Sequence, residues 1–435
     1  IVFGDWSSDV CSSDLRKAIP LHIKTLDNGL TVVVAEKRKV PVVCLNIAYK
    51  VGSKDELHGK TGLAHLFEHL MFQGTENVPK GEFDRLCSMA GGVNNAYTTY
   101  DYTCYNMSLP SYQLELGLWL ESDRLRKFSV TDDALLNQQK VVVEEISQTV
   151  DDQPYGKWRD VLARAAYDPQ CSYHWEIHGS KDHVAGCSMA DVEEIFNNYY
   201  QPNNACMVIT GDVDAASAFD MAGNYFGQIP NLTENKRRNE FRPEFLRGGV
   251  QDSFGDSIPM PGVFLAFHCP GFMDDGIYLA DMIANIYAGG RSSPFYRKLT
   301  YEKQLASYVG SVIEKKEHNS LLIFYAIANE PGVTADILFA EMLECINETA
   351  ARGITEEEFT KSINQMTIQY ANSIQYSTGV ADLLAQHMLF WNNPGKFYEI
   401  LDKFRNLRIK DINSFANNIL TKANMIRVDA LPNGN

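Results

Sequence analysis

The sequence predicts an α+β protein built from two homologous α/β repeats, each about half of the 435-residue chain. Runs with the two-residue periodicity of strands alternate along it with longer runs that have helical periodicity. Residues 63–74 align without a gap with residues 279–290, and residues 130–145 align with residues 354–369. Because both pairs occur in the same order, we infer that one α/β unit is used twice.

The duplication and the composition predict four consecutive stretches. Residues 1–15 fit no periodic pattern and resemble translated adapter sequence, so we expect an artefactual or disordered leader in place of the native N-terminus. We predict a first domain at 16–229 and a second at 249–435. Between them, residues 230–248 form a polar and charged run interrupted by prolines, which is typical of a linker.

The first repeat is predicted to begin with an Asn28–Gly29 turn that leads into a strand. Ser111 and Thr131 precede amphipathic runs and are predicted helix N-caps. The elements predicted in order are strands at 30–34 and 42–51, helices at 63–72 and 81–90, a strand at 97–107, helices at 111–127 and 131–146, a strand at 206–211, and a helix ending at Phe226.

The composition argues against several classes of protein and of partner. The net charge of −16 argues against a nucleic-acid partner. No apolar run approaches the ~20 residues of a membrane span, so none is expected. The nine cysteines are scattered, which favours buried free thiols over a disulfide framework. Cys171, His174 and His178 have metal-ligand spacing, but the absence of a second Cys and of a clear helix argues against a site there.

The predicted helix at 63–72 carries the pattern with the clearest chemistry. His65 and His69 are one turn apart on one face, and Glu68 lies next to them. Two imidazoles at this spacing can bind one Zn²⁺, while the carboxylate can deprotonate a water on the metal. The alternative is a surface helix that carries these three residues by chance.

The second repeat keeps the helices and loses the candidate ligands. Residues required only for folding should persist in both copies, whereas the four candidate positions, His65, Glu68, His69 and Glu145, all differ in the second repeat. This supports a metal site in the first repeat alone. In the alignment, His65 becomes Asp281, Glu68 becomes Ala284, His69 becomes Asn285 and Glu145 becomes Gln369.

Several further motifs extend the pattern over nearly the whole chain. They lie at residues 28–30, 51–56, 63–75, 95–98, 119–124, 141–145 and 211–213. With these motifs the sequence resembles the M16 (pitrilysin-type, inverzincin) zinc metallopeptidases, especially the short subfamily of mitochondrial processing peptidase and its bacterial relatives. The resemblance implies a clamshell-like, LuxS/metallohydrolase-like fold with mixed, largely antiparallel sheets packed with helices.

The resemblance implies a zinc-dependent metalloendopeptidase that cleaves unfolded or short peptides with a zinc-bound water activated by Glu68. It makes His65 and His69 ligands of one Zn²⁺ per chain, with a Glu about 76 residues later as the third. Glu145 has that spacing; its neighbour Glu144 competes, and helical geometry lets only one of them face the metal. We choose Glu145.

Substrate is expected to extend along the strand that includes Asn95 and Ala96, with these two residues near the scissile bond; a plain turn-to-strand junction is the alternative. Relatives carry an Arg/Tyr pair in the second repeat. Here Pro294 replaces the Arg and Tyr308 is displaced by one position, while Arg291 has the wrong spacing to substitute.

The resemblance further implies a homodimer, or a heterodimer with a related M16 chain that carries the Arg/Tyr pair. We expect a bacterial periplasmic or exported location. The competing hypothesis is a non-catalytic scaffold or binding subunit, which loss of the ligand set would indicate; here the set is intact.

Overall fold

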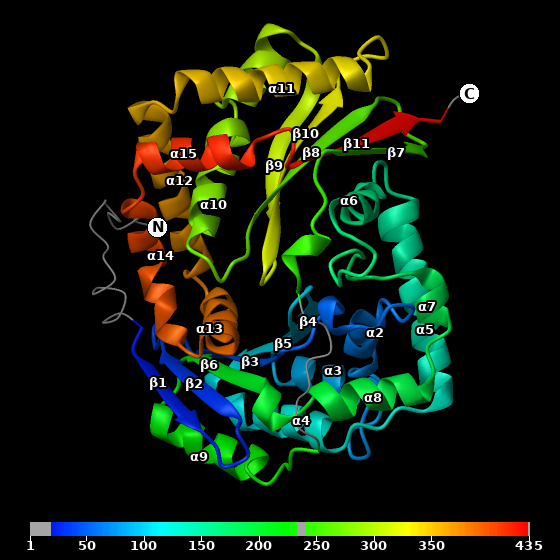
Figure 1. The fold of residues 1–435 in the computed structure, drawn as a ribbon. Coiled ribbons are helices and arrows are strands. Elements are labelled where there is room, and N and C mark those ends of the chain that lie inside the picture. The colour runs from blue at the N-terminus through cyan, green and yellow to red at the C-terminus, as the bar shows by residue number, and fades with distance from the viewer. Residues whose placement is uncertain (1–18, 233–240, 434–435) are drawn as a thin grey trace. The chain divides into compact units, whose positions relative to one another are not determined.

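The computed structural model describes residues 19–232 and 241–433 (Figure 1). The predicted leader at 1–15 lies outside the described residues, and so does the middle of the predicted linker. No helix in the described part of the chain is long and apolar enough to cross a membrane. The described residues form two compact units, each built around one β-sheet.

The first sheet has six strands in the order β1-β2-β6-β3-β5-β4. Only the β2–β6 pair is parallel. The strands are β1 (Leu21–Thr25), β2 (Thr31–Glu36), β3 (Val42–Tyr49), β4 (Val93–Thr98), β5 (Thr103–Pro110) and β6 (Ala205–Gly211). This order leaves β4 as an edge strand.

The second sheet repeats this arrangement, with five strands in the order β7-β11-β8-β10-β9. Its single parallel pair, β7–β11, corresponds to β2–β6, and the remaining pairs are antiparallel. The strands are β7 (Val250–Asp256), β8 (Gly262–Pro270), β9 (Ala306–Glu314), β10 (Asn319–Ala328) and β11 (Met425–Pro432). The shared order confirms the predicted α+β class with two homologous repeats and mixed, largely antiparallel sheets.

Each run predicted to be helical contains a helix, and the described residues add helices that the sequence patterns did not predict. In chain order they are α2 (Leu63–Leu70), α3 (Glu82–Met89), α4 (Leu114–Arg126), α5 (Asp132–Ile146), α6 (Trp158–Ala166), α7 (Lys181–Ala185), α8 (Met189–Tyr199), α9 (Ala215–Phe226), α10 (Gly276–Ala288), α11 (Ala335–Arg352), α12 (Glu356–Ser373), α13 (Ser377–Trp391), α14 (Ile400–Arg405) and α15 (Ile409–Ile419). Helix α10 corresponds to α2, and α12 corresponds to α5.

The compact units do not coincide with the two halves of the sequence. The first unit comprises 19–143, 177–232 and 368–402, and the second comprises 144–176, 241–367 and 403–433. The prediction of two successive domains describes the duplicated halves and stays a prediction.

Each sheet is therefore covered by a helix from the other half of the sequence. Helix α13 packs on β3 and β6, and α6 packs on β7, β8 and β11. In Figure 1 the orange α13 lies beside blue and green strands. Its apolar residues join one core with small side chains of the first sheet: Val380, Ala381, Leu384, Ala385 and Met388 pack with Ala35, Cys44, Ala48 and Cys206. The small sheet residues let the helix approach closely.

Two local predictions are wrong. The run at 97–107 is not one strand, because a turn at 99–102 divides it into β4 and β5. Ser111 is not an N-cap; its hydroxyl donates to Asp212 Oδ2 at 3.1 Å instead. The Thr131 cap is confirmed, since Thr131 Oγ1 accepts from the backbone N–H of Ala134 at 3.2 Å.

Candidate metal centre

The N-terminus of α2 is held by a carboxylate. Glu56 accepts hydrogen bonds from the backbone N–H groups of Gly62 and Ala64, at 3.0 and 2.8 Å. These are two of the donors that the first turn of a helix leaves unsatisfied. Gly62 has φ 85°, and a Cβ there would lie 2.4 Å from the carbonyl oxygen of His178. The start of α2 is thus fixed by the carboxylate of Glu56 and by close packing of Gly62 against His178.

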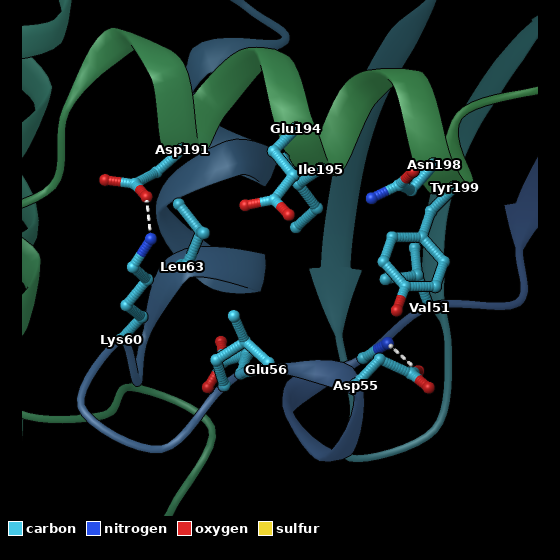
Figure 2. A pocket seen from close by; sticks show the side chains of 12 residues that line it. Val51, Asp55, Glu56, Lys60, Leu63, Asp191, Glu194, Ile195, Asn198 and Tyr199 are labelled. Carbon is cyan, nitrogen blue, oxygen red and sulfur yellow. Dashed lines mark hydrogen bonds and ion pairs between the residues drawn. The ribbon is translucent and has the colours of Figure 1, made fainter. Parts of the chain in front are cut away.

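A small pocket of about 30 Å³ lies beside this entry (Figure 2). Helix α8 forms one wall, and Lys60 pairs with Asp191 at its rim. Its lining residues are Val51, Gly52, Asp55, Glu56, Leu57, Lys60, Leu63, Asp191, Glu194, Ile195, Asn198 and Tyr199. No member of the predicted metal site is among them, so this pocket is separate from the predicted chemistry.

Helix α2 places both histidines on its less buried side. Leu66, Phe67 and Leu70 are fully buried, whereas His65 and His69 are half-buried. The Nε2 atoms of the two imidazoles are 3.3 Å apart, and the rings are nearly perpendicular, at 88°. Two nitrogens this close can bind the same metal ion.

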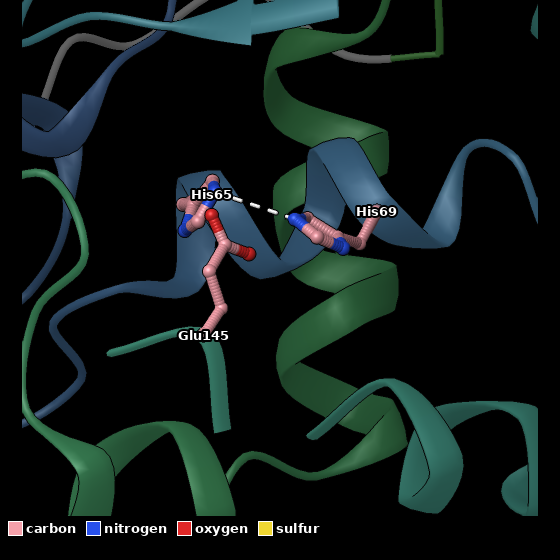
Figure 3. A group of neighbouring side chains, drawn as sticks. All are labelled: His65, His69 and Glu145. Atoms are coloured by element: carbon pink, nitrogen blue, oxygen red, sulfur yellow. Dashed lines mark hydrogen bonds between the residues drawn. The ribbon is translucent and has the colours of Figure 1, made fainter. Parts of the chain in front are cut away.

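Glu145 completes a group of three, shown in Figure 3. One ligand atom from each of His65, His69 and Glu145 lies within 4.8 Å of the others. Helix α5 is continuous from Asp132 to Ile146, and all but its last three residues belong to the first unit. Glu144 is exposed and accepts a hydrogen bond from Gln148 Nε2 at 2.9 Å. Of the two adjacent glutamates, the structure groups Glu145 with the histidines.

The donor set fits zinc. Two imidazole nitrogens and one carboxylate oxygen are a ligand set of catalytic zinc sites, which keep a fourth position for water or substrate. Within residues 19–232 and 241–433, no other group of three His, Cys, Asp or Glu side chains has its ligand atoms gathered in this way. Cys171, His174 and His178 in particular are not gathered; His174 and His178 instead contact backbone carbonyls.

Glu68 lies on α2 between the two histidines in sequence and is 9% exposed. Its Oε2 accepts a hydrogen bond of 2.5 Å from the hydroxyl of Thr98. Sequence reasoning missed Thr98, since a hydrogen bond between a strand and a helix 30 residues apart leaves no periodic signal.

The corresponding position in the second repeat is occupied by different chemistry. Asp281 of α10 forms an ion pair of 2.8 Å with Lys315, and Ser311 donates to the backbone carbonyl of Ala284. An ammonium group next to the position of the first histidine opposes binding of a cation. The two repeats thus differ at this position in the charge of the surroundings as well as in the identity of the side chains.

The predicted substrate residues Asn95 and Ala96 lie in the middle of the edge strand β4. Asn94 and Thr98 contact α3 and α2, whereas Tyr97 contacts α13 on the opposite face of the sheet. The free edge and the position next to α2 suit an added peptide strand. Arg291 and Tyr308 are both exposed, and Tyr308 stacks on Tyr325.

A buried polar cluster fixes β4 from the α13 side. Asp382 Oδ1 accepts hydrogen bonds from Asn46 Nδ2 at 2.7 Å and from the Tyr97 hydroxyl at 3.2 Å. Burial raises the pKa of the Asp382 carboxyl above its ordinary value, although both hydrogen bonds oppose that rise. Sequence reasoning missed Asp382, because it enters the first unit only through the exchange of α13.

Asp382→Asn is expected to stabilise the protein increasingly as pH rises. A carboxyl whose pKa is higher in the folded state than in the unfolded state contributes stability at low pH, and this is lost as pH rises through the folded pKa. Asn keeps the oxygen acceptor without the charge. Melting temperatures of both proteins from pH 4 to pH 8 check this, with the exposed Asp220→Asn as control. A difference that does not change with pH contradicts the prediction.

The fold and this group together define a two-repeat α+β protein in which three side chains of the first repeat that could hold a metal ion lie close together. Known families match both repeats. Residues 31–174 match the family described as Insulinase (Peptidase family M16), and residues 186–366 match the Peptidase M16 inactive domain.

Relatives of similar length agree with these matches. The zinc protease PqqE of Helicobacter pylori is 30% identical over 413 residues, covering 93% of this chain and 92% of that protein. The mitochondrial-processing peptidase subunit beta of Blastocladiella emersonii is 23% identical, covering 92% and 86%. The ubiquinol-cytochrome-c reductase complex core protein I of Euglena gracilis is 25% identical, covering 89% and 83%. The chain belongs to the M16 peptidase family.

Solved structures share the fold. A protease from Helicobacter pylori is similar with a TM-score of 0.88 and 27% identity, over 95% of this chain and all of that one. The first half of the periplasmic protease PqqL from Escherichia coli has a TM-score of 0.74 at 18% identity, over 95% and 92%.

Proposed function

We propose that the chain is a zinc-dependent metalloendopeptidase that hydrolyses unfolded or short peptides. The grouping of His65, His69 and Glu145 in an M16 chain is the observation that carries this proposal. The second repeat, in which these ligands are replaced, has no such group among its described residues.

Each residue of the site has a distinct role. His65 and His69 would each give an imidazole nitrogen, and Glu145 a carboxylate oxygen, to one Zn²⁺. Zinc in such a site supplies Lewis acidity, which lowers the pKa of a water and polarises the scissile carbonyl. Glu68 takes the proton of the attacking water and delivers it to the leaving amine nitrogen.

Substrate binding is assigned to the free edge of β4. An extended peptide can pair with the backbone of Asn95 and Ala96 as an additional strand. Thr98 at the end of β4 contacts Glu68, so a peptide on this edge runs close to the proposed base. Recognition through backbone hydrogen bonds suits unfolded chains, because a folded protein has few free strands to offer.

The proposed assembly is a dimer, of two copies or with a related M16 chain that carries the Arg/Tyr pair. Two observations support it: the altered Arg and Tyr positions of the second repeat, and relatives whose names describe a subunit and a complex core protein. A periplasmic or exported location is proposed from the similar fold of the periplasmic PqqL.

The second candidate is a non-catalytic scaffold subunit, which the similarity to a complex core protein favours. The two candidates differ in zinc content and turnover. A scaffold has no use for the three gathered ligands, so the intact group favours the peptidase.

Zinc removal is expected to abolish peptide cleavage reversibly. The full-length chain is purified, its zinc is measured, and cleavage of a mixed set of unstructured peptides is followed before and after chelation. One equivalent of Zn²⁺ per chain should restore activity, since the site holds a single ion. A folded protein of similar size serves as the uncleaved control. Cleavage that persists without metal contradicts the proposal.

A further inference from the structure

The hydrogen bond between Thr98 and Glu68 lies at the short end of the range for a hydroxyl and a carboxylate, at 2.5 Å. Charge-assisted bonds of this kind are about twice as strong as bonds between neutral groups. Glu68 is almost fully buried, so solvent competes weakly for its Oε2. The contact therefore restricts the rotation of the Glu68 carboxylate.

Thr98 itself is fixed by the tip of its own hairpin. A Cβ on Gly52 would lie 2.4 Å from the carbonyl oxygen of Thr99, so the turn that follows Thr98 packs directly on this loop. The backbone N–H of Ser53 donates to the same carbonyl at 3.2 Å. Lys54 and Asp101 form an ion pair of 2.7 Å with side chains only 4% and 2% exposed. The hydroxyl of Thr98 is thus attached to a rigid support.

The opposite face of β4 is fixed as well. Tyr97, the neighbour of Thr98, donates to Asp382 of α13 at 3.2 Å. Because successive side chains of a strand point to opposite faces, β4 is held from both sides at two adjacent residues. The result is a fixed hydroxyl next to Glu68.

We propose that Thr98 is a positioning residue that holds Glu68 in the orientation from which it exchanges a proton with the attacking water. The inference rests on the proposed function. A base that is already oriented needs no rearrangement during the reaction, so its positioning acts on kcat and leaves substrate affinity unchanged. Substrate reaches the edge of β4 through its backbone, which a side-chain change at Thr98 leaves intact.

Three variants of the full-length zinc-loaded protein test this role. Thr98→Val keeps the side-chain shape and removes the hydroxyl, whereas Thr98→Ser keeps the hydroxyl. Thr210→Val is the matched control, because it removes a buried hydroxyl from the same sheet that donates to the carbonyl of Ser377 at 3.1 Å. Thr98→Val should lower kcat by roughly 10- to 100-fold, part of the 10²–10⁴ of a general base, with KM and zinc content unchanged. Thr98→Ser, which keeps the hydroxyl, should have a kcat within about threefold of the parent protein's kcat.

A readout without turnover tests the contact in the metal-free protein. Unfolding midpoints of Thr98→Val, of Glu68→Leu, which removes both carboxylate oxygens, and of the double variant form a thermodynamic cycle. The double variant should lose less stability than the sum of the two single variants. Additive effects overturn the proposed contact.

The kinetic outcomes separate the two proposals. If Thr98→Val and Thr210→Val have the same kcat, or if Thr98→Ser is as slow as Thr98→Val, the positioning role is wrong while the peptidase assignment stands. If Thr98→Val changes KM or zinc content instead of kcat, the residue acts on binding and the inference is overturned. A wild-type protein that binds zinc without cleaving any peptide contradicts the proposed function and removes this inference with it.

Discussion

Glu68→Gln is expected to lower kcat by about 10²- to 10⁴-fold, the contribution of a positioned general base. Gln keeps the shape of the side chain and an oxygen that can accept the hydrogen bond from Thr98. It cannot take a proton from water at neutral pH. Zinc content and the melting temperature should stay close to those of the parent protein, because Glu68 is not a member of the ligand group.

The measurement is steady-state cleavage of a fluorogenic unstructured peptide, together with metal analysis of the same preparation. Glu76→Gln is a suitable control, since Glu76 is exposed and its carboxylate forms an ion pair with Lys127 at the surface. Full activity of Glu68→Gln with zinc bound would mean that another group moves the proton, and the proposed mechanism would be wrong.

Glu145→Gln is expected to weaken zinc binding by more than about 100-fold, beyond the 10- to 100-fold effect typical of residues outside the ligand set. Replacing a carboxylate ligand by a neutral amide removes both the charge and the preferred donor. Glu144→Gln should change zinc affinity by no more than about twofold, because Glu144 is an exposed side chain whose replacement costs little.

The two variants form a matched pair, since they make the same chemical change at adjacent positions of α5. Zinc affinity is measured by competition with a chromophoric chelator, and peptide cleavage follows the metal content. Equal zinc affinities for the two variants would contradict the assignment of Glu145. A larger effect at Glu144 would exchange the roles of the two glutamates.

The two candidate histidine ligands could be predicted because local helix geometry determines where they lie relative to each other. Spacing of four residues in a helix places His65 above His69, and the loss of both in the second repeat marks them as chemical rather than structural. The third candidate ligand could not be chosen by spacing alone, which left Glu144 and Glu145 as alternatives. Only the rotation of α5 about its axis separates them, and it groups Glu145 with the histidines.

The turn at 99–102 is only weakly indicated by its composition, because Asp101 is its single common turn residue between two tyrosines. The hydroxyl of Thr99 accepts from the backbone N–H groups of Asp101 and Tyr102, at 3.1 and 3.0 Å, and so stabilises the turn. The docking of this turn against Gly52 adds a tertiary contact that periodicity does not contain. The Ser111 cap failed for a similar reason, because Asp212 offers its hydroxyl a different partner.

The exchange of α6 and α13 was also outside the reach of sequence patterns. Which sheet each helix covers depends on chain connectivity in three dimensions. Asp382 illustrates the consequence, since its partners Asn46 and Tyr97 lie more than 280 positions earlier in the chain.

This exchange has a consequence for synthesis on the ribosome. The first sheet is complete once β6 has been made, but the helix that covers Cys44, Ala48 and Val208 is α13, which follows almost 170 residues later. At the usual 5–20 residues per second, that apolar face waits roughly ten to thirty seconds for its cover. During this interval the nascent chain exposes an apolar surface, which is prone to aggregation until α13 or a chaperone covers it. Expression of residues 16–229 alone should accordingly yield insoluble protein.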